Sequence, residues 1–293
     1  MRKRRVMESV DVSIIIRAYN ASNYILRSLY SVANTDYKGS IETIICYDKG
    51  SKDDTMIKIR EFESSLIGKH EKFLMRVIEH EHTAPFRALL ECGFKYSSGR
   101  FISILDADNL YPKKRISALI NTWKKTGASF IFTPIVVFED KTLKILKKIE
   151  APKNPCSQFN LLKGNNIDAS AMFIHRQCLD KIVSKLSKLD SRVYDWVFED
   201  WLLAILATKY CKCFYTDNTY SLYRVHQSNL TGFKSDIPSK NVFNTIRDIL
   251  TLMAFYEIER EALDMKEFIL LYSTLLNRII RLGFWTSKHF NIL

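Results

Sequence analysis

Short apolar runs alternate with amphipathic segments through the first 128 residues. The runs that predict strands are 12–16, 41–47, 73–78 and 101–105. Between and after them, apolar residues recur at helical spacing, which predicts helices over about 25–33, 53–62 and 85–97 and a further one from Pro112. Ser22 is the expected cap of the first helix. Strands that alternate with helices predict an α/β fold with a mostly parallel sheet flanked by helices.

The pattern changes after residue 128. Strands are predicted at 129–133, 135–138, 143–149 and 171–174, with a hairpin between the second and third and a strand pair near 212–225. A loop rich in Asn, Gly and Lys covers 153–168, and helices are predicted at about 176–188 and 199–210. Residues 239–285 are almost wholly helical in pattern. We therefore divide the chain into a domain over 1–235, with a nucleotide-binding half (11–128) and an acceptor half (129–235), and a helical C-terminal extension over 236–293.

Length and composition indicate a globular protein with a sizeable core, since 47% of its 293 residues are hydrophobic. No apolar run approaches the ~18 residues of a membrane-spanning helix. The basic start of the chain precedes an apolar stretch too short for a signal peptide. Six cysteines follow no metal-ligand spacing and mostly have apolar neighbours, which predicts reduced thiols and a cytoplasmic location.

Positive charge is concentrated in the middle of the chain. The formal net charge is +12, and residues 140–192 carry 11 basic against five acidic side chains. This excess predicts an anionic partner, such as phosphates, an acidic glycan or a lipid surface, unless it is only a solvated lysine-rich surface. Nucleic acid is not expected as a partner, because no basic motif interleaved with aromatic residues is present.

Two carboxylates, Asp106 and Asp108, directly follow the apolar strand at 101–105. Strand alternation points both to the same side. Ligands of open α/β sheets bind at the carboxyl ends of the strands. Carboxylate oxygens there suit Mg²⁺ or Mn²⁺ holding a diphosphate. Taken alone, the pair is a weak signal, because two carboxylates in a loop usually form only a solvated turn.

The first two strands also end in polar segments. Asp48 begins a turn that contains Gly50 and leads into a helix, and Ala18-Tyr19-Asn20 ends the first strand. Much of the Asp48 segment is explained by turn and helix-start chemistry. The Asp48 carboxylate can nevertheless accept a hydrogen bond from a nucleobase, and Tyr19 offers a ring for stacking.

Five stretches, taken together and in order, resemble the inverting family-2 glycosyltransferases of the GT-A fold. They are Ile-Ile-Ile-Arg-Ala-Tyr-Asn20, Tyr-Asp48-Lys-Gly-Ser-Lys-Asp-Asp-Thr, Leu-Asp106-Ala-Asp108-Asn, Phe-Glu199-Asp200-Trp-Leu and Tyr-Arg224-Val-His226-Gln-Ser-Asn. The resemblance covers roughly residues 11–232. It implies transfer of a sugar from a nucleotide-diphosphate sugar, by default a UDP-sugar, to a hydroxyl of a glycan or lipid-linked acceptor, assisted by Mn²⁺ or Mg²⁺.

The resemblance also implies roles for single residues. The donor-binding residues would be Ala18, Tyr19, Asn20, Asp48, Asp106 and Asp108. Asp108 would ligate the metal with His226 nearby, and Asp200 would be the general base. Glu199 and Asn166, the latter with Asn165 and Asp168, are candidates for the acceptor side. The alternatives are a helix-start role for Glu199 and Asp200, an ordinary strand end for His226 and a plain turn around Asn166. His80 and His82 are rejected as a metal site, because a lone His-x-His pair is usually incidental.

Two positions depart from the family pattern. Lys49 stands where a second aspartate is usual, and Leu90 stands where an arginine commonly contacts the base or diphosphate. Arg87 and Lys49 itself are the candidate cations for compensation. These departures leave open a catalytically weak or inactive nucleotide-sugar-binding module. A sugar nucleotidyltransferase is disfavoured, because no glycine-rich loop follows the first strand.

The C-terminal segment 267–285 is strongly apolar. Its apolar positions at helical spacing are 268, 271, 272, 275, 276, 279 and 282. Three interpretations remain open: packing on the core, a homodimer, or peripheral contact with a membrane. The basic residues and the aromatic pair Phe284 and Trp285 favour the membrane, whereas the width of the apolar face favours burial.

Overall fold

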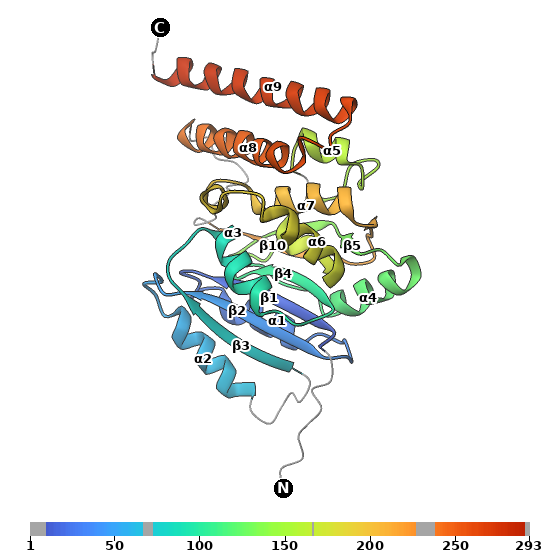
Figure 1. Ribbon diagram of the computed structural model, residues 1–293. Coiled ribbons are helices and arrows are strands. Elements are labelled where there is room, and N and C mark those ends of the chain that lie inside the picture. The colour runs from blue at the N-terminus through green and yellow to red at the C-terminus, as the bar shows by residue number, and fades with distance from the viewer. Residues whose placement is uncertain (1–9, 67–72, 166, 227–237, 291–293) are drawn as a thin grey trace.

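A seven-stranded sheet forms the centre of the protein in the computed structural model, which describes residues 10–66, 73–165, 167–226 and 238–290 (Figure 1). In spatial order its strands are β3 (Phe73–His80), β2 (Ile41–Asp48), β1 (Val12–Ala18), β4 (Phe101–Asp106), β8 (Met172–His175), β5 (Phe130–Phe132) and β9 (Cys213–Tyr215). The first four are mutually parallel, and β8 runs antiparallel to both β4 and β5. The predicted α/β class with a mostly parallel sheet is confirmed.

Both faces of the sheet are covered, because the strands are apolar on both sides. In β1, Ile14 and Ile16 point to one face and Ile15 to the other, as strand alternation requires. The first face packs against α1 (Ile25–Ala33), α2 (Thr55–Leu66) and α4 (Arg115–Thr126). The second packs against α3 (Pro85–Ala88), the π-helix η1 (Leu89–Phe94), α6 (Arg176–Leu186) and α7 (Glu199–Tyr210).

One predicted helix cap and one predicted helix start are wrong. Helix α1 starts after Tyr24, and Ser22 is not its cap; the Ser22 backbone N–H instead donates to Asp53 at 2.9 Å. Helix α4 starts at Arg115 rather than Pro112. The guanidinium of Arg115 is fully buried and donates to the carbonyl of Ser170 at 2.9 Å. Ser22 and Arg115 thus both contact segments that are distant in the sequence.

A second, three-stranded sheet lies beside the first, in the order β10 (Ser221–Val225), β6 (Ile135–Glu139) and β7 (Ile145–Ile149). The predicted hairpin is present as the antiparallel pair β6–β7. The strand pair expected near 212–225 is wrong: β9 pairs with β5 in the first sheet, whereas β10 pairs with β6 in the second. Local patterning predicts strands but not their partners, since pairing is set by packing.

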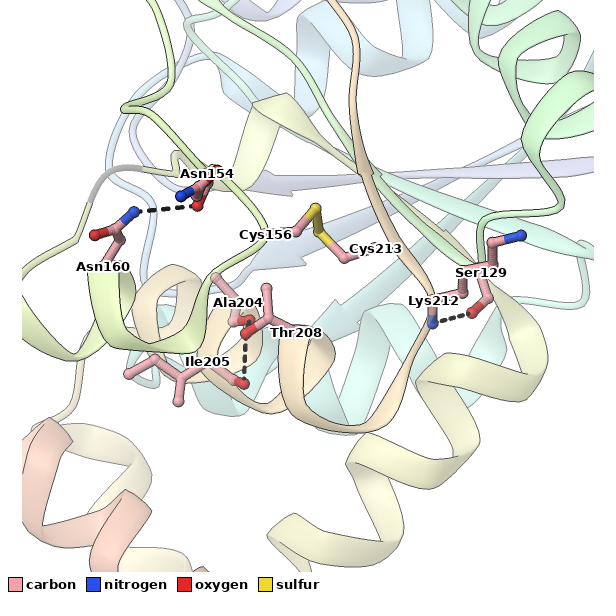
Figure 2. Close-up of a disulfide and its surroundings, with 9 residues drawn as sticks. All are labelled: Ser129, Asn154, Cys156, Asn160, Ala204, Ile205, Thr208, Lys212 and Cys213. Carbon is pink, nitrogen blue, oxygen red and sulfur yellow. Dashed lines mark hydrogen bonds between the residues drawn. A yellow bond between two sulfur atoms is a disulfide. The ribbon is translucent and has the colours of Figure 1, made fainter. Parts of the chain in front are cut away.

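The loop expected over 153–168 contains a helix, α5 (Gln158–Lys163). Its start is held by Asn160, whose side chain donates to the carbonyl of Asn154 at 3.1 Å, and by the Cys156–Cys213 disulfide, which ties the preceding loop to β9 (Figure 2). The indole of Trp201 donates to the carbonyl of Leu161 at 2.6 Å. Helix α5 is therefore anchored from both sides.

The prediction of reduced cysteines is wrong in this structure, where all six are paired. The disulfides are Cys46–Cys92, Cys156–Cys213 and Cys178–Cys211. The partners lie 33 to 57 residues apart, so only the fold brings them together. The cysteines consequently give no support for a reducing compartment.

The helices predicted over 239–285 are α8 (Pro238–Glu259) and α9 (Met265–Phe290). They stack in turn on α7, so that α9 is the outermost helix, at the end of the molecule opposite α2 (Figure 1). Leu252, Phe255 and Leu271 belong to the same core as Trp201. In the described part of the chain, no helix has both the length and the hydropathy needed to span a bilayer.

Candidate active site

The register of the parallel strands brings the predicted donor residues to one edge of the sheet. Arg17 lies opposite Asp106, Ala18 lies opposite Tyr47, and Asp48 lies opposite His80. The carboxyl ends of β1, β2 and β4 therefore meet, as the sequence predicted from parallel pairing.

Asp48, Tyr19 and His82 form one end of this edge. The Asp48 carboxylate is almost fully buried and accepts from the backbone N–H of Gly50 at 2.8 Å, and it contacts Nδ1 of His82 at 2.9 Å. The His82 ring lies 4.7 Å from the Tyr19 ring, and Tyr19 is 48% exposed. Sequence reasoning missed His82 as a neighbour of Asp48. Its position just beyond β3, which runs parallel to β2, was the available signal.

Asn20 has a structural part in the same region. Its φ of 46° lies in the left-handed region that Asn tolerates better than most residues. Its side-chain oxygen accepts from the backbone N–H of Lys52 at 2.8 Å, and its own N–H donates to Ser51. Asn20 thus joins the end of β1 to the turn after β2.

The two candidate compensating cations are engaged elsewhere. Lys49 forms an ion pair with Glu81. Arg87 forms an ion pair with Asp195 at 3.0 Å, in the short helix η3 (Ser191–Asp195). Leu90 is packed against the main hydrophobic core. In the described residues, both candidates for replacing the arginine that the family usually carries at position 90 are thus paired with carboxylates.

Asp108 and His226 meet at the other end of the edge. Their side chains contact at 3.0 Å between Oδ2 and Nε2, and the His226 ring stacks on Tyr24 with centroids 4.3 Å apart. Arg224 is fully buried and donates to the carbonyl of Asp108 at 2.7 Å, which fixes the backbone there.

The chemistry of this pair fits a divalent cation. Carboxylate oxygen and imidazole nitrogen are ligands of Mn²⁺, and Mg²⁺ sites commonly use one or two carboxylates together with substrate phosphates. Across the described residues, no group of three or more His, Cys, Asp or Glu is arranged to hold a metal. A cation at Asp108 and His226 would therefore need further oxygen ligands from a diphosphate and water.

Arg17 links the donor edge to α7. Its Nη2 lies 2.5 Å from Oδ1 of Asp106, and its Nη1 lies 2.5 Å from Oε1 of Glu199. Burial alone would lower the pKa of Arg17, but the two carboxylates outweigh it and raise that pKa. Sequence reasoning missed Arg17, although a charged residue at the end of an apolar strand beside Asp106 was a visible signal. Arg17 joins the two predicted halves of the domain at the site.

Asp200 and Glu199 are adjacent in the sequence, but their pKa values are shifted in opposite directions. Burial and the neighbouring Glu199 raise the pKa of Asp200 to about 7, although Asn165 donates a side-chain hydrogen bond to it. Burial would also raise the pKa of Glu199, but the ion pair with Arg17 outweighs it and lowers that pKa. Two carboxyl groups with pKa values pushed apart are typical of sites where one acts in proton transfer.

Asp168 lies among the other carboxylates. It caps the short helix η2 (Ala169–Ala171), where its Oδ1 accepts from the Ser170 N–H at 2.8 Å. Burial, Asp106 and Asp200 raise its pKa well above the ordinary value. The negative charge of Asp108 also raises the pKa of Asp168. Asp106, Asp108, Asp168 and Asp200 therefore interact electrostatically, and we call these four side chains the carboxylate cluster. Asn166 lies outside the described residues.

We expect the reaction rate to depend on pH through Asp200. A general base must be ionised, and half of Asp200 is ionised near its pKa of about 7. The turnover number should therefore rise as pH increases from 5.5 and level off above about 8. A pH–rate profile at saturating donor and metal measures this, and a rate that is flat from pH 5.5 to 8 would contradict the assignment.

Comparison with known proteins identifies the class to which this fold and site belong. The family model described as Glycosyl transferase family 2 matches residues 13–182. This match covers more than half of the chain, so the chain belongs to glycosyl transferase family 2 and is a glycosyltransferase. The resemblance inferred from the five sequence stretches is confirmed.

Two curated relatives come from Escherichia coli. Both are described as UDP-Glc:alpha-D-GlcNAc-diphosphoundecaprenol beta-1,3-glucosyltransferases. WfgD is 28% identical over 174 residues, which cover 59% of this chain and 64% of WfgD. WfaP is 27% identical over 238 residues, which cover 80% of this chain and 86% of WfaP.

Solved structures share the GT-A fold with this chain. S. aureus TarS 1-349 in complex with UDP has a TM-score of 0.60 at 15% identity. The aligned part covers 97% of this chain and 76% of the TarS chain. The mannosyltransferase PcManGT from Pyrobaculum calidifontis, in complex with GDP-Man and Mn²⁺, has a TM-score of 0.62 at 14% identity. The aligned part covers 96% of this chain and 74% of the PcManGT chain. At these identities the likeness shows the fold alone.

Proposed function

We propose that this glycosyltransferase moves one sugar from a UDP-sugar to a hydroxyl group of a lipid-linked acceptor, with inversion at the anomeric carbon. The observation that carries the proposal is the carboxylate cluster, which joins the Asp108–His226 pair to a buried Asp200 with a pKa near 7. The donor and acceptor classes are supported by the names of the E. coli relatives, of which WfaP aligns with most of this chain.

The nucleotide would lie along the edge formed by β1 and β2. Asp48 is buried at the end of β2, and Tyr19 presents an exposed ring beside His82. A uracil ring can stack on Tyr19 while its N–H donates to the Asp48 carboxylate, which as an ionised group accepts several hydrogen bonds. Ala18 is small and buried, so the backbone of β1 would approach the ribose closely.

The diphosphate would lie at the opposite end, near Asp106 and Asp108. A divalent cation held there by Asp108 and His226 would neutralise the charge that develops on the departing diphosphate. Asp106 is held by Arg17. Arg17 thereby offsets part of the negative charge of the cluster, which would otherwise repel a diphosphate.

Asp200 would act on the acceptor. It would accept the proton of the acceptor hydroxyl while that oxygen bonds to the anomeric carbon. The bond from the anomeric carbon to the diphosphate oxygen would break on the opposite face, releasing UDP and inverting the configuration. Asn165 donates to Asp200 and would hold the carboxylate in place for this transfer.

The test is transfer to a defined lipid acceptor. Purified full-length protein would be incubated with Mn²⁺, an α-linked GlcNAc-diphospho-lipid and one of UDP-glucose, UDP-galactose, UDP-GlcNAc or GDP-mannose. We expect one UDP-sugar to be consumed, with a product one sugar heavier by mass spectrometry and a β-linkage by NMR. An α-linked product would contradict inversion. UDP-sugar binding without turnover on any acceptor would instead favour a binding module.

A further inference from the structure

Helix α9 is docked on the protein through one face only. On that inner face Leu271 is buried in the main core, and Glu267 forms an ion pair with Lys209 at 2.9 Å. Arg278 lies 3.2 Å from Asp248 of α8. These contacts hold α9 in place without the apolar side chains on its outer face.

The outer face of α9 is an apolar stripe that is open to solvent. Its exposed apolar members are Met265, Phe268, Ile269, Tyr272, Leu276, Ile279 and Ile280. Tyr272 and Ile280 are 62% and 59% exposed. The structure thus divides the single apolar face that the sequence predicted, since 271 and 275 pack inward while 268, 272, 276 and 279 face outward. The side chains of Phe284 and Trp285 lie outside the described part of the chain.

The shape and charge of this stripe match a membrane interface. At about 100° per residue, its seven apolar side chains fall within an arc of roughly 120°. Lys266 is exposed and lies about 40° beyond one edge of that arc, whereas Arg281 lies towards the inner face of the helix, where its charge acts on Asp248 of α8. From Met265 to Gly283 no acidic side chain is exposed, because the one acidic residue, Glu267, is buried. Interfacial helices combine an apolar face with basic charge at its edge, the place that Lys266 takes here.

The inner face of α9 touches the loop that holds the proposed general base. Arg278 donates to the carbonyl of Lys163 at 3.2 Å, at the end of α5. Asn165, which bonds Asp200, follows two residues later. A helix with its side chains is about 10–12 Å wide, so the outer stripe lies roughly one helix diameter from this loop. A sugar joined to a lipid through a diphosphate projects from the membrane surface over a comparable distance.

We propose that the outer stripe of α9 lies in the interface of an anionic membrane and brings the active site to its lipid-linked acceptor. This inference rests on the proposed acceptor class. A two-fold dimer through the stripe would set Lys266 against a surface that has no exposed carboxylate between Met265 and Gly283, the nearest being Asp264 just before the stripe. An anionic lipid surface supplies the complementary charge.

Vesicle flotation with the full-length protein tests the proposal, because removing α9 would expose the core around Leu271. The probes are vesicles of phosphatidylcholine alone and of phosphatidylcholine with phosphatidylglycerol. The stripe variant is Tyr272→Asp with Leu276→Asp. Its matched control is Ile57→Asp with Ile145→Asp, which places two charges on exposed apolar residues of α2 and β7. A charge variant, Lys266→Glu, is matched by Lys124→Glu.

We expect the wild type and both controls to float with the anionic vesicles. The stripe variant should lose about 100-fold in vesicle partitioning, since two apolar side chains no longer enter the interface. The charge variant should lose about tenfold. Transfer to a short, water-soluble GlcNAc-diphospho acceptor should stay unchanged in every variant, which separates this proposal from the catalytic one. No flotation of the wild type, equal loss in the matched controls, or a dimer in sedimentation equilibrium that the stripe variant dissociates would overturn it.

Discussion

Asp200→Asn is expected to lower the turnover number by about 10²–10⁴-fold, the range that general-base catalysis typically contributes. The amide cannot accept the proton of the acceptor hydroxyl, yet it retains the size of the carboxyl group. Donor affinity should hardly change, because Asp200 lies on α7, whereas Asp48 and Tyr19 lie at the ends of β2 and β1. Single-turnover rates and the UDP-sugar Kd, measured on the same preparation, check both expectations. Loss of donor affinity in proportion to turnover would contradict the assignment.

The matched control for this variant is Asp195→Asn. Asp195 is a half-exposed carboxylate five residues earlier that pairs with Arg87 outside the cluster. It should leave turnover within about twofold, as expected for a surface ion pair.

Folding of the Asp200→Asn variant is not expected to suffer. The folded-state pKa of Asp200 is about 7 against an ordinary value of 3.8. The folded state therefore binds the proton more tightly than the unfolded chain, and wild-type stability falls as pH rises from about 4 to 7. The asparagine has no such loss, so the Tm of the variant should equal or exceed that of the wild type at pH 8. A lower Tm would indicate that the lowered turnover of the variant comes from a structural defect and not from the loss of the general base.

Asp108→Asn is expected to abolish the part of UDP affinity that depends on Mn²⁺. Changing a residue behind a metal ligand already lowers metal affinity by about 10–100-fold, so loss of a direct carboxylate ligand should reach at least that range. Titration calorimetry with UDP, with and without Mn²⁺, measures the difference. In the wild type Mn²⁺ should strengthen UDP binding, and in the variant the two Kd values should coincide.

Two further variants sharpen this result. Asp54→Asn removes an exposed carboxylate from the turn after β2 and should keep the full Mn²⁺ dependence. His226→Gln should weaken that dependence without removing it, since Asp108 remains. An unchanged Mn²⁺ effect in Asp108→Asn would refute the proposed cation site.

Some of the site was predictable from the sequence because it follows from local rules. Strand periodicity and parallel pairing were enough to bring Ala18, Asp48 and Asp106 to one edge of the sheet. The Asp108–His226 contact followed from the family resemblance, although 118 residues separate the two side chains. The nearness of Asp200 to the donor-side carboxylates followed in the same way.

Other features escaped prediction because they depend on which distant surfaces meet. Arg17 looked like the end of a strand, and only the position of α7 gives it Glu199 as a second partner. Lys49 and Arg87 were candidates for compensation, but the fold places other carboxylates next to them. Lysine and arginine side chains are long and pair with carboxylates that the fold brings close. Their separation in the sequence therefore does not predict which residues pair.

The sequence by itself determined the order of strands and helices, the polar strand ends and the family, because periodicity and motif order are local properties of the chain. The tertiary structure decided the pairing of the six cysteines, the separation of β9 from β10 and the pKa of Asp200. It also decided which half of the apolar surface of α9 faces the core. These depend on burial and on contacts between segments far apart in the chain, which no local pattern contains.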